Sequence, residues 1–491
     1  MLDPLYNTEE VYLLEKKIAQ NNQITMALLM QRAGHALFQC IPKDANNVII
    51  FIGPGNNGGD GIVAASFLKQ FNTTVEVIHL TPLTKLSSLS MLMLKHAKAL
   101  GVSFKAFTPT LLNQLNLSEN DVIIDAIFGI GLSKAPQGNF KKAIDWINQS
   151  NAYVISADCP SGLCANTGAP IKMAISANMT CQFLFKKQGL YSEIASLYTG
   201  DLFFDDLAID KIDIYSVNHS VNLLTNSYIE NSRKKRLSSS HKGMLGHVLI
   251  IGGDTGMGGA GILNAFAALK SGAGKVTLLT KPEHVSASLS FVPEVMVKGI
   301  NENDDICEYL NCADVIAIGS GMSSNLTWSQ HFFELVLNTQ LTKPKVFDAG
   351  ILHYLAKAPP IKSKLKNTVI TPHVGEAAML LNSDSKSIVT NRFSAVNQLV
   401  KTYHATSILK GKGTLIQSPK QLASLCPCGN PYMATAGMGD MLTGIVASYL
   451  AQKYPIQLAS ELAVWDHANK ADELFKLGKT PMLASEIFNR F

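Results

Sequence analysis

Two segments of this chain share one order of features: a short apolar run, a glycine-rich loop directly after it, and a stretch with the apolar spacing of a helix. The apolar runs are residues 48–52 and 248–251, the loops are 53–61 and 252–261, and the helical stretches are 62–70 and 262–271. A short apolar run ending at glycine is typical of a parallel sheet, because helices cover both faces of such a sheet. The sequence therefore predicts a strand–loop–helix unit in each half of the chain.

Strand and helix signals alternate along the rest of the chain. Residues 5–30 have helical spacing, and further strands are predicted at residues 75–80, 122–125, 154–158, 276–279, 315–318, 369–370 and 406–409. This alternation predicts an α/β protein with doubly wound parallel sheets. A chain of 491 residues exceeds the usual size of one domain. Two domains are therefore expected, over residues 1–215 and 241–491, with a linker over residues 216–240.

Composition and charge narrow the class of protein. A net charge of +5 is too small for a nucleic-acid footprint on a chain of this length, so the basic run at residues 233–236 is interpreted as part of the linker. No stretch approaches the ~18 apolar residues of a membrane span, and residues 1–16 lack the apolar core of a secretory signal. The eight cysteines lack the CxxC pairs usual for zinc. We expect a cytoplasmic homo-oligomer with no nucleic-acid or membrane partner.

The loop at residues 53–61 reads Gly-Pro-Gly-Asn-Asn-Gly-Gly-Asp-Gly and lies between a predicted strand and a predicted helix. Glycines let backbone amides approach an anion, and the start of a helix favours a phosphate. Two asparagines stand among the glycines of this loop, which argues against the glycine loop of an ordinary NAD dehydrogenase. An ordinary tight turn is the alternative. The loop therefore predicts a phosphate-binding site.

Two further predicted strands in the first half end in acidic residues. Asp125 begins the segment Asp-Ala-Ile-Phe-Gly-Ile-Gly-Leu, and Asp158 begins the segment Asp-Cys-Pro-Ser-Gly. Ligands of open α/β sheets bind at the carboxyl ends of the strands, so these loops and the glycine–asparagine loop are expected to meet at one pocket. Taken singly, each aspartate could instead cap a helix.

The second half contains the segment Ala-Thr-Ala-Gly-Met-Gly-Asp-Met-Leu-Thr-Gly at residues 434–444. Consecutive amides before a helix form an anion hole, and Asp440 at its edge is placed to act as a base. This arrangement is that of ribokinase-like enzymes, in which the glycine turn stabilises a transferring phosphoryl group. An ordinary helix start with an acidic first turn is the alternative.

Three other loops of the second half follow predicted strands. Residues 410–414, Lys-Gly-Lys-Gly-Thr, have the donors to hold nucleotide phosphates, with a hairpin turn as the alternative. His373 follows the strand at 369–370, where ligand contact is favoured over a purely structural role. Gly321 lies in the glycine pair after the strand at 315–318. These positions predict one binding edge.

The motifs of the first half resemble the NAD(P)H-hydrate epimerases over residues 5–210, with a Rossmann-like fold. The resemblance implies a potassium ion with Asn57, Asp125 and Ser161 as ligands, and Asp158 as the residue of proton transfer. It implies that the substrate contacts a larger set of residues: Asn56, Asn57, Gly58, Gly59, Asp60, Gly129, Ile130, Gly131, Leu132, Ser133, Lys134, Ala135 and Asp158. The segment Ser133-Lys134-Ala135 departs from the Arg-Gly expected after the glycines.

The second half, from residue 240 to 491, resembles the ADP-dependent NAD(P)H-hydrate dehydratases, and the fused order resembles the bifunctional bacterial repair proteins. The resemblance implies Asp440 as the catalytic carboxylate, hydrated NADH or NADPH as substrate, and magnesium at the site. Substrate contacts are implied for Ala260, Gly321, His373 and Asp440. ADP contacts are implied for Lys410, Gly411, Lys412, Gly413, Thr414, Asn430, Ala436, Gly437, Met438 and Gly439. Val374 and Tyr432 replace the usual Pro and Gly.

Three other functions remain open on the sequence alone. A kinase of a small alcohol or vitamin shares the anion hole with its aspartate, but it requires ATP and yields a phosphorylated product. The first half could be a binding or scaffold module without catalysis, although Asn57, Asp125, Asp158 and Ser161 are all present. A plain NAD dehydrogenase is the third alternative, and the two asparagines of the first glycine loop argue against it.

Overall fold

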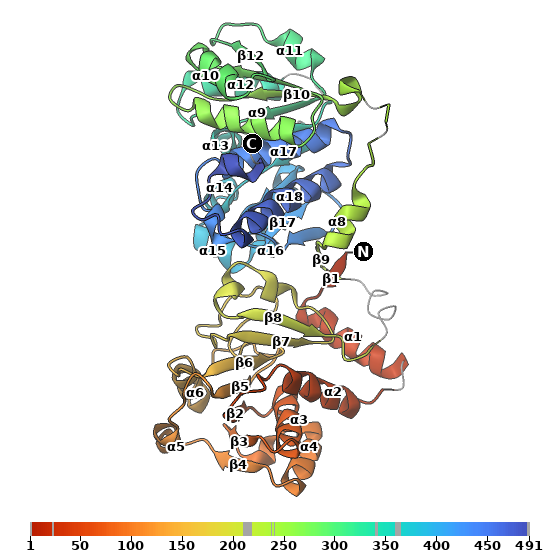
Figure 1. Ribbon diagram of the computed structural model, residues 1–491, viewed down its shortest axis with the longest axis vertical. Coiled ribbons are helices and arrows are strands. Elements are labelled where there is room, and N and C mark those ends of the chain that lie inside the picture. The colour runs from red at the N-terminus through yellow and green to blue at the C-terminus, as the bar shows by residue number, and fades with distance from the viewer. Residues whose placement is uncertain are drawn as a thin grey trace. The chain divides into compact units, whose positions relative to one another are not determined.

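The computed structural model describes residues 2–21, 24–209, 219–236, 238–239, 241–338, 342–358 and 365–488. The chain divides into two compact units (Figure 1). One unit is Pro4–Val221, and the other is Asn222–Phe491 together with Met1–Asp3. Each unit is built on its own sheet of mainly parallel strands, so the α/β class expected from the sequence is confirmed.

The N-terminal unit contains a seven-stranded sheet in the order β4-β3-β2-β5-β6-β7-β8, and every neighbouring pair is parallel. The strands are β2 (Asn47–Ile52), β3 (Thr74–His79), β4 (Ser103–Ala106), β5 (Val122–Ala126), β6 (Tyr153–Ala157), β7 (Met179–Phe183) and β8 (Asp201–Asp205). The strand order reverses between β2 and β5, which is where open sheets of this kind bind ligands.

Helices cover both faces of this sheet (Figure 1). They are α1 (Thr8–Asn21), α2 (Met26–Gln39), α3 (Asn56–Gln70), α4 (Ser88–Ala99), α5 (Pro109–Gln114) and α6 (Asn139–Ile147). The apolar run of β2 is continuous because its two faces enter different cores. Ile50 packs in the core shared with α2 and α3, whereas Phe51 packs in the core shared with α6.

The expected single helix over residues 5–30 is wrong, because α1 ends at Asn21 and α2 starts at Met26. Thr25 makes α2 start as a new helix. Its backbone is extended, and its hydroxyl accepts a hydrogen bond from the Leu28 amide at 3.2 Å. A threonine cap satisfies an amide that would otherwise be unpaired at the helix start. The helical spacing continues across the break because both helices pack on the same core.

The C-terminal unit contains an eleven-stranded sheet in the order β1-β9-β18-β17-β16-β15-β14-β13-β10-β11-β12. The seven strands β10 to β16 pair in parallel with their neighbours within this group. Strand β17 pairs antiparallel with both β16 and β18. Their bounds are β1 (Asp3–Leu5), β9 (Val221–Leu223), β10 (His247–Ile251), β11 (Lys275–Thr280), β12 (Met296–Gly299), β13 (Val315–Ile318), β14 (Lys345–Phe347), β15 (Thr368–Ile370), β16 (Thr406–Leu409), β17 (Thr414–Gln417) and β18 (Ala423–Cys426).

Three helices, α9 (Gly258–Lys270), α17 (Met438–Ala451) and α18 (Ile456–Lys476), pack on one face of this sheet and form its main core. The remaining helices are α8 (Asn226–Ser232), α10 (Val285–Phe291), α11 (Cys307–Cys312), α12 (Thr327–Asn338), α13 (Gly350–Lys357), α14 (Val374–Leu380), α15 (Ser385–Thr390) and α16 (Arg392–Tyr403). No helix in the described part of the chain is long and apolar enough to cross a membrane.

Much of the segment expected to be a linker is ordered structure of the C-terminal unit. Residues 216–218, 237 and 240 of that segment lie outside the described residues, but α8 falls within it. The Tyr228 hydroxyl donates a hydrogen bond to Glu461 at 2.8 Å, and Arg233 forms an ion pair with Asp466 at 2.5 Å. The basic run therefore begins with a residue that holds α8 against α18.

Candidate active sites

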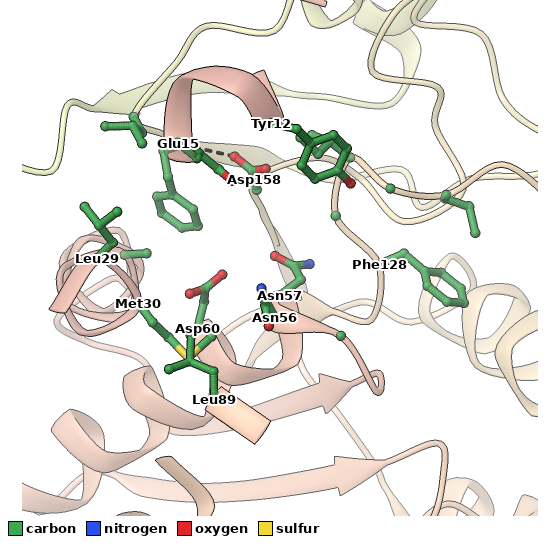
Figure 2. A pocket seen from close by; sticks show the side chains of 18 of the residues that line it. Tyr12, Glu15, Leu29, Met30, Asn56, Asn57, Asp60, Leu89, Phe128 and Asp158 are labelled. Carbon is green, nitrogen blue, oxygen red and sulfur yellow. Dashed lines mark hydrogen bonds between the residues drawn. The ribbon is translucent and has the colours of Figure 1, made fainter. Parts of the chain in front are cut away.

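A cavity of about 490 Å³ lies at the carboxyl ends of β2, β5 and β6 (Figure 2). This volume falls within the ~300–1,000 Å³ that is usual for small-molecule sites. Its polar lining includes Glu15, Asn56, Asn57, Asp60 and Asp158. The first of these comes from α1, and the others come from the loops and the helix start that the sequence predicted to converge.

The predicted phosphate loop is shorter than expected, because α3 already begins at Asn56. Asn56 and Asn57 therefore stand in the first turn of a helix, where backbone amides have no partner within the helix. The loop also approaches β5 closely, since a Cβ on Gly53 would lie 1.9 Å from the carbonyl oxygen of Ile127. Only glycine fits this contact between the two loops that bound the cavity.

We expect Gly53→Ala to destabilise the N-terminal unit by about 1–3 kcal/mol, because the methyl group would overlap backbone that cannot move away freely. Gly55→Ala is the matched control, since a Cβ there meets nothing within 4 Å. Thermal unfolding of both variants gives the comparison. Equal melting temperatures for the two variants would contradict the close packing of this loop.

Asp125 and Ser161 form a buried polar cluster beneath the cavity, and both are fully buried. Asp125 accepts hydrogen bonds from the Ser161 hydroxyl at 2.5 Å, the Ser161 amide at 2.8 Å and the Ser156 hydroxyl at 2.9 Å. Burial raises the pKa of Asp125, while these hydrogen bonds oppose the rise. Asn57 is also buried, and neither polar atom of its side chain has a hydrogen-bond partner.

These three side chains suit a hard cation. They supply a carboxylate, a hydroxyl and an unpaired amide oxygen, and oxygen ligands are those that alkali and alkaline-earth ions prefer. A Cβ on Gly129 would lie 3.7 Å from the Asn57 Oδ1, so this oxygen borders the backbone after β5. The unpaired Asn57 amide is the observation that most favours a ligand here, because a buried polar group without a partner costs free energy.

Asp158 lies at the edge of the cavity and is paired with a lysine. Its carboxylate accepts hydrogen bonds from the Lys187 ammonium and from the Phe183 amide, and Lys187 is only 2% exposed. Lys187 also donates to the Phe183 carbonyl at 2.8 Å. Asp158 has a φ of +64°, which is rare for residues other than glycine and is often found at functional sites.

The other predicted residues of this site divide into two groups. Residues 129–134 line the cavity. The cavity lining does not include Gly58, Gly59 or Ala135. A Cβ added to Gly58 would lie only 2.4 Å from the Gly53 carbonyl oxygen. The two glycines therefore permit close packing of α3.

The second site is formed by loops at the carboxyl ends of β10, β13, β14, β15 and β16 and by the start of α17. Gly437 has a φ of +90° and is the residue before α17, and Asp440 follows in the first turn. A Cβ on Gly439 would lie 3.4 Å from the Lys410 ammonium and 3.8 Å from a carboxylate oxygen of Asp348. The predicted anion hole thus faces a lysine and a second aspartate.

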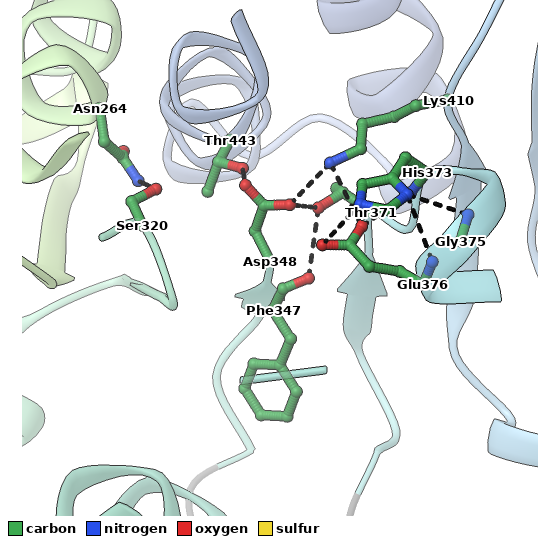
Figure 3. Close-up of polar contacts among 10 residues, drawn as sticks. All are labelled: Asn264, Ser320, Phe347, Asp348, Thr371, His373, Gly375, Glu376, Lys410 and Thr443. Carbon is green, nitrogen blue, oxygen red and sulfur yellow. Dashed lines mark hydrogen bonds and ion pairs between the residues drawn. The ribbon is translucent and has the colours of Figure 1, made fainter. Parts of the chain in front are cut away.

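Asp348 is the centre of a polar network in this site (Figure 3). It is 1% exposed and accepts hydrogen bonds from Thr371 at 2.6 Å, Thr443 at 2.8 Å and Lys410 at 3.0 Å. Lys410 also lies 3.7 Å from Glu376. Burial alone would lower the pKa of Lys410, but the charges of Asp348 and Glu376 raise it, so the lysine remains a cation.

Burial, with the nearby charge of Asp348, raises the pKa of Asp440 to about 6. A hydrogen bond from Ser320 and the charge of Lys410 oppose the rise. A carboxylate whose pKa lies near the working pH is suited to accept a proton and later to release it. Asp440 therefore has the properties of a general base, in the first turn of the helix that follows the predicted anion hole.

The remaining residues predicted to contact ligands at this site lie in different local structures. Gly321 has a φ of +65°, and its added Cβ would lie 2.9 Å from the Cβ of Ala260, so the structure brings these two positions together. His373 is exposed, and its Nδ1 accepts the Gly375 amide at 3.0 Å as the cap of α14. Residues 410–413 join the antiparallel strands β16 and β17, so this loop is a hairpin.

Asn430 is held in place by α18, because its side chain donates a hydrogen bond to Asp472 at 2.9 Å.

Sequence reasoning missed Glu15 and Lys187 in the first site and Asp348 and Glu376 in the second. Asp348 directly follows the short strand β14, so the rule that ligands bind at strand ends could have identified it. Glu15 gives no such signal, because it comes from a helix outside the sheet.

Comparison with known proteins covers both units. A family described as NAD(P)H-hydrate dehydratase matches residues 248–491, and one described as YjeF-related protein N-terminus matches residues 26–189. The bifunctional NAD(P)H-hydrate repair enzyme Nnr of Coxiella burnetii is 36% identical over 99% of this chain and 98% of its own length. The enzyme of the same name from Escherichia coli is 34% identical over 97% of this chain and 90% of its own length.

Among solved structures, a ribokinase-like superfamily protein from Enterococcus faecalis matches with a TM-score of 0.52 and 28% identity. The match covers 55% of this chain and 93% of that protein. The ribokinase-like fold expected for the second half is confirmed. The similarity to full-length relatives shows in addition that both units, in this order, recur in one polypeptide.

Proposed function

The chain belongs to the family of bifunctional NAD(P)H-hydrate repair enzymes, and from this premise we propose which of its residues perform each reaction. The N-terminal unit epimerises hydrated NADH and NADPH in the cavity beside Asn57 and Asp158. The C-terminal unit dehydrates one epimer at Asp440 with consumption of ADP. The observation that carries the proposal is the position of Asp440, at a glycine-rich helix start that faces Lys410 and Asp348.

Dehydration restores the double bond of the nicotinamide ring. Asp440 accepts the proton of the ring hydroxyl, whose oxygen attacks the terminal phosphoryl group of ADP and displaces AMP. The amides before α17 and the Lys410 ammonium stabilise the charge that develops on the phosphoryl oxygens. Elimination of phosphate with loss of a ring proton then forms the double bond. Asn430, Lys412 and Thr414 border the expected position of ADP.

Two ions accompany these reactions in the proposal. Asn57, Asp125 and Ser161 hold potassium, which would supply a fixed positive charge beside the anionic dinucleotide; the unpaired Asn57 amide and the buried Asp125 support this assignment. Magnesium accompanies ADP, because nucleotide phosphates carry it to most enzymes that use them. In the described part of the chain no three His, Cys, Asp or Glu side chains form a metal cluster, so magnesium would be bound largely by phosphate and water.

A single assay tests both activities. Purified protein is mixed with both epimers of NADPH hydrate, and recovery of the reduced-nicotinamide absorbance is followed with ADP, with ATP or with neither. Recovery from both epimers, only with nucleotide, is expected. Recovery of one epimer's share, after correction for spontaneous epimerisation, would remove the epimerase from the proposal. Sodium in place of potassium and omission of magnesium test the two ions, and a lasting phosphorylated product would indicate a kinase.

The dehydration rate is expected to rise with pH and to level off above pH 6, because Asp440 with a pKa of about 6 must be ionised to accept a proton. The epimerase is not expected to share this dependence, since its site lacks Asp440. Initial rates with the reactive epimer between pH 5 and 8 provide the measurement, with ADP saturating at each pH. A flat profile through pH 6 would contradict the role of Asp440.

We also propose that the protein acts in the cytoplasm and assembles into a homo-oligomer. Membership of a family whose substrates are soluble dinucleotides supports the first statement. The exposed apolar side chains of Leu13, Phe71 and Leu197 support the second. Light scattering on the purified protein measures the oligomeric state directly.

A further inference from the structure

The cavity of the N-terminal unit contains more carboxyl groups than substrate binding explains. Glu15 on α1, Asp60 on α3 and Asp158 after β6 all line it, and Figure 2 shows Glu15 beside Asp158 and Asp60 below them. Phosphate groups of a dinucleotide repel carboxylates. Acidic side chains in such a pocket therefore require a chemical reason.

Glu15 has the surroundings of a group that exchanges protons. Its carboxyl group makes no hydrogen bond or ion pair within the described residues, so it is free to meet a ligand. Burial raises the pKa of Glu15 to about 7, the charge of Asp158 adds to the rise, and the charge of Lys187 opposes it. Tyr12, one turn earlier on α1, faces the same cavity.

The two neighbouring carboxyl groups differ from Glu15. Asp158 is paired with the buried Lys187 ammonium, whereas Glu15 has no such partner among the described residues. Burial, with the nearby charges of Asp158 and Glu15, raises the pKa of Asp60 well above its ordinary range. Glu15 and Asp158 thus differ: Glu15 has a raised pKa, and Asp158 is held by a lysine.

Building on the proposed epimerase, we propose that Glu15 is a catalytic acid–base residue that works together with Asp158 on the substrate ring. The Glu15 carboxyl gives its proton to the hydroxyl on C6 as the carbon–oxygen bond breaks, so that water leaves and the ring nitrogen lone pair forms a carbon–nitrogen double bond. Water adds to C6 from the opposite face and gives its proton to Asp158. Proton exchange with solvent restores both groups, and in the reverse direction their roles are exchanged.

Glu15→Gln in the full-length protein is the test, with Glu9→Gln on the exposed side of the same helix as the matched control. We expect the epimerase kcat to fall by about 10²–10⁴-fold with little change in KM, because the amide keeps the shape but carries no exchangeable acid proton. The melting temperature and the dehydratase rate should be unchanged. An epimerase rate close to that of the parent would overturn the proposal.

The pH profile separates this role from a structural one. The epimerase needs one proton shared between Glu15 and Asp158, so the parent rate is expected to fall above pH 7 as that proton is lost. The fall should disappear in Glu15→Gln and persist in Asp60→Asn. Loss of the fall in Asp60→Asn alone would assign the proton to Asp60 instead. If the parent itself does not epimerise, the proposed function fails before Glu15 is tested.

Discussion

Asp440→Asn is expected to lower the rate of ADP-dependent dehydration by about 10²–10⁴-fold, because the amide cannot accept the proton of the substrate hydroxyl. The same substitution is expected to stabilise the C-terminal unit at neutral pH. Burial and Asp348 raise the pKa of Asp440 from an ordinary value near 4 to about 6, so ionisation costs stability between these pH values. Removal of the charge should recover about 1–2 kcal/mol above pH 6.

A loss of activity together with a gain in stability would distinguish Asp440 from a residue that merely maintains the fold. Stopped-time dehydration assays and thermal unfolding at pH 7 measure the two effects. The epimerase rate of the same variant is the internal control, and Asp384→Asn, at the exposed cap of α15, controls for the substitution type. A dehydration rate within a few-fold of the parent would remove Asp440 from the mechanism.

The strands that a sequence predicts well here are those with continuous apolar runs. Residues 48–52 and 248–251 fall within β2 and β10, because both faces of these central strands are buried. β7 gives no such run, since Thr180 and Gln182 are polar but fully buried and are satisfied by hydrogen bonds within the unit. Without β7 in the prediction, the loop that carries Lys187 could not be located.

The residues of the candidate sites likewise divide into those that a local sequence pattern reveals and those that depend on tertiary packing. Asp125, Asp158 and Asp440 could be found from the sequence because each stands directly at a strand end or a helix start. Glu15 could not, because its position in the first cavity depends on how α1 packs across the sheet, and no local pattern encodes that packing. The pairing of Asp158 with Lys187 is likewise a tertiary contact between residues 29 positions apart.

The second large effect is expected for Asp158→Asn, which should abolish measurable epimerisation and leave dehydration of the reactive epimer intact. Asparagine suits the φ of +64° at this position, so the backbone should not be strained further. The substitution does leave the Lys187 ammonium, 2% exposed, without its counter-ion. We therefore expect a loss of about 3 kcal/mol in the stability of the N-terminal unit.

The stability loss and the catalytic loss can be separated with a double variant. Asp158→Asn combined with Lys187→Met removes the buried charge as well, so thermal stability should recover while the epimerase remains inactive. If the double variant regains both stability and epimerisation, Asp158 serves only to neutralise Lys187. If it regains stability alone, the carboxylate itself takes part in proton transfer, because the fold is then intact and only the group that carries the proton is missing.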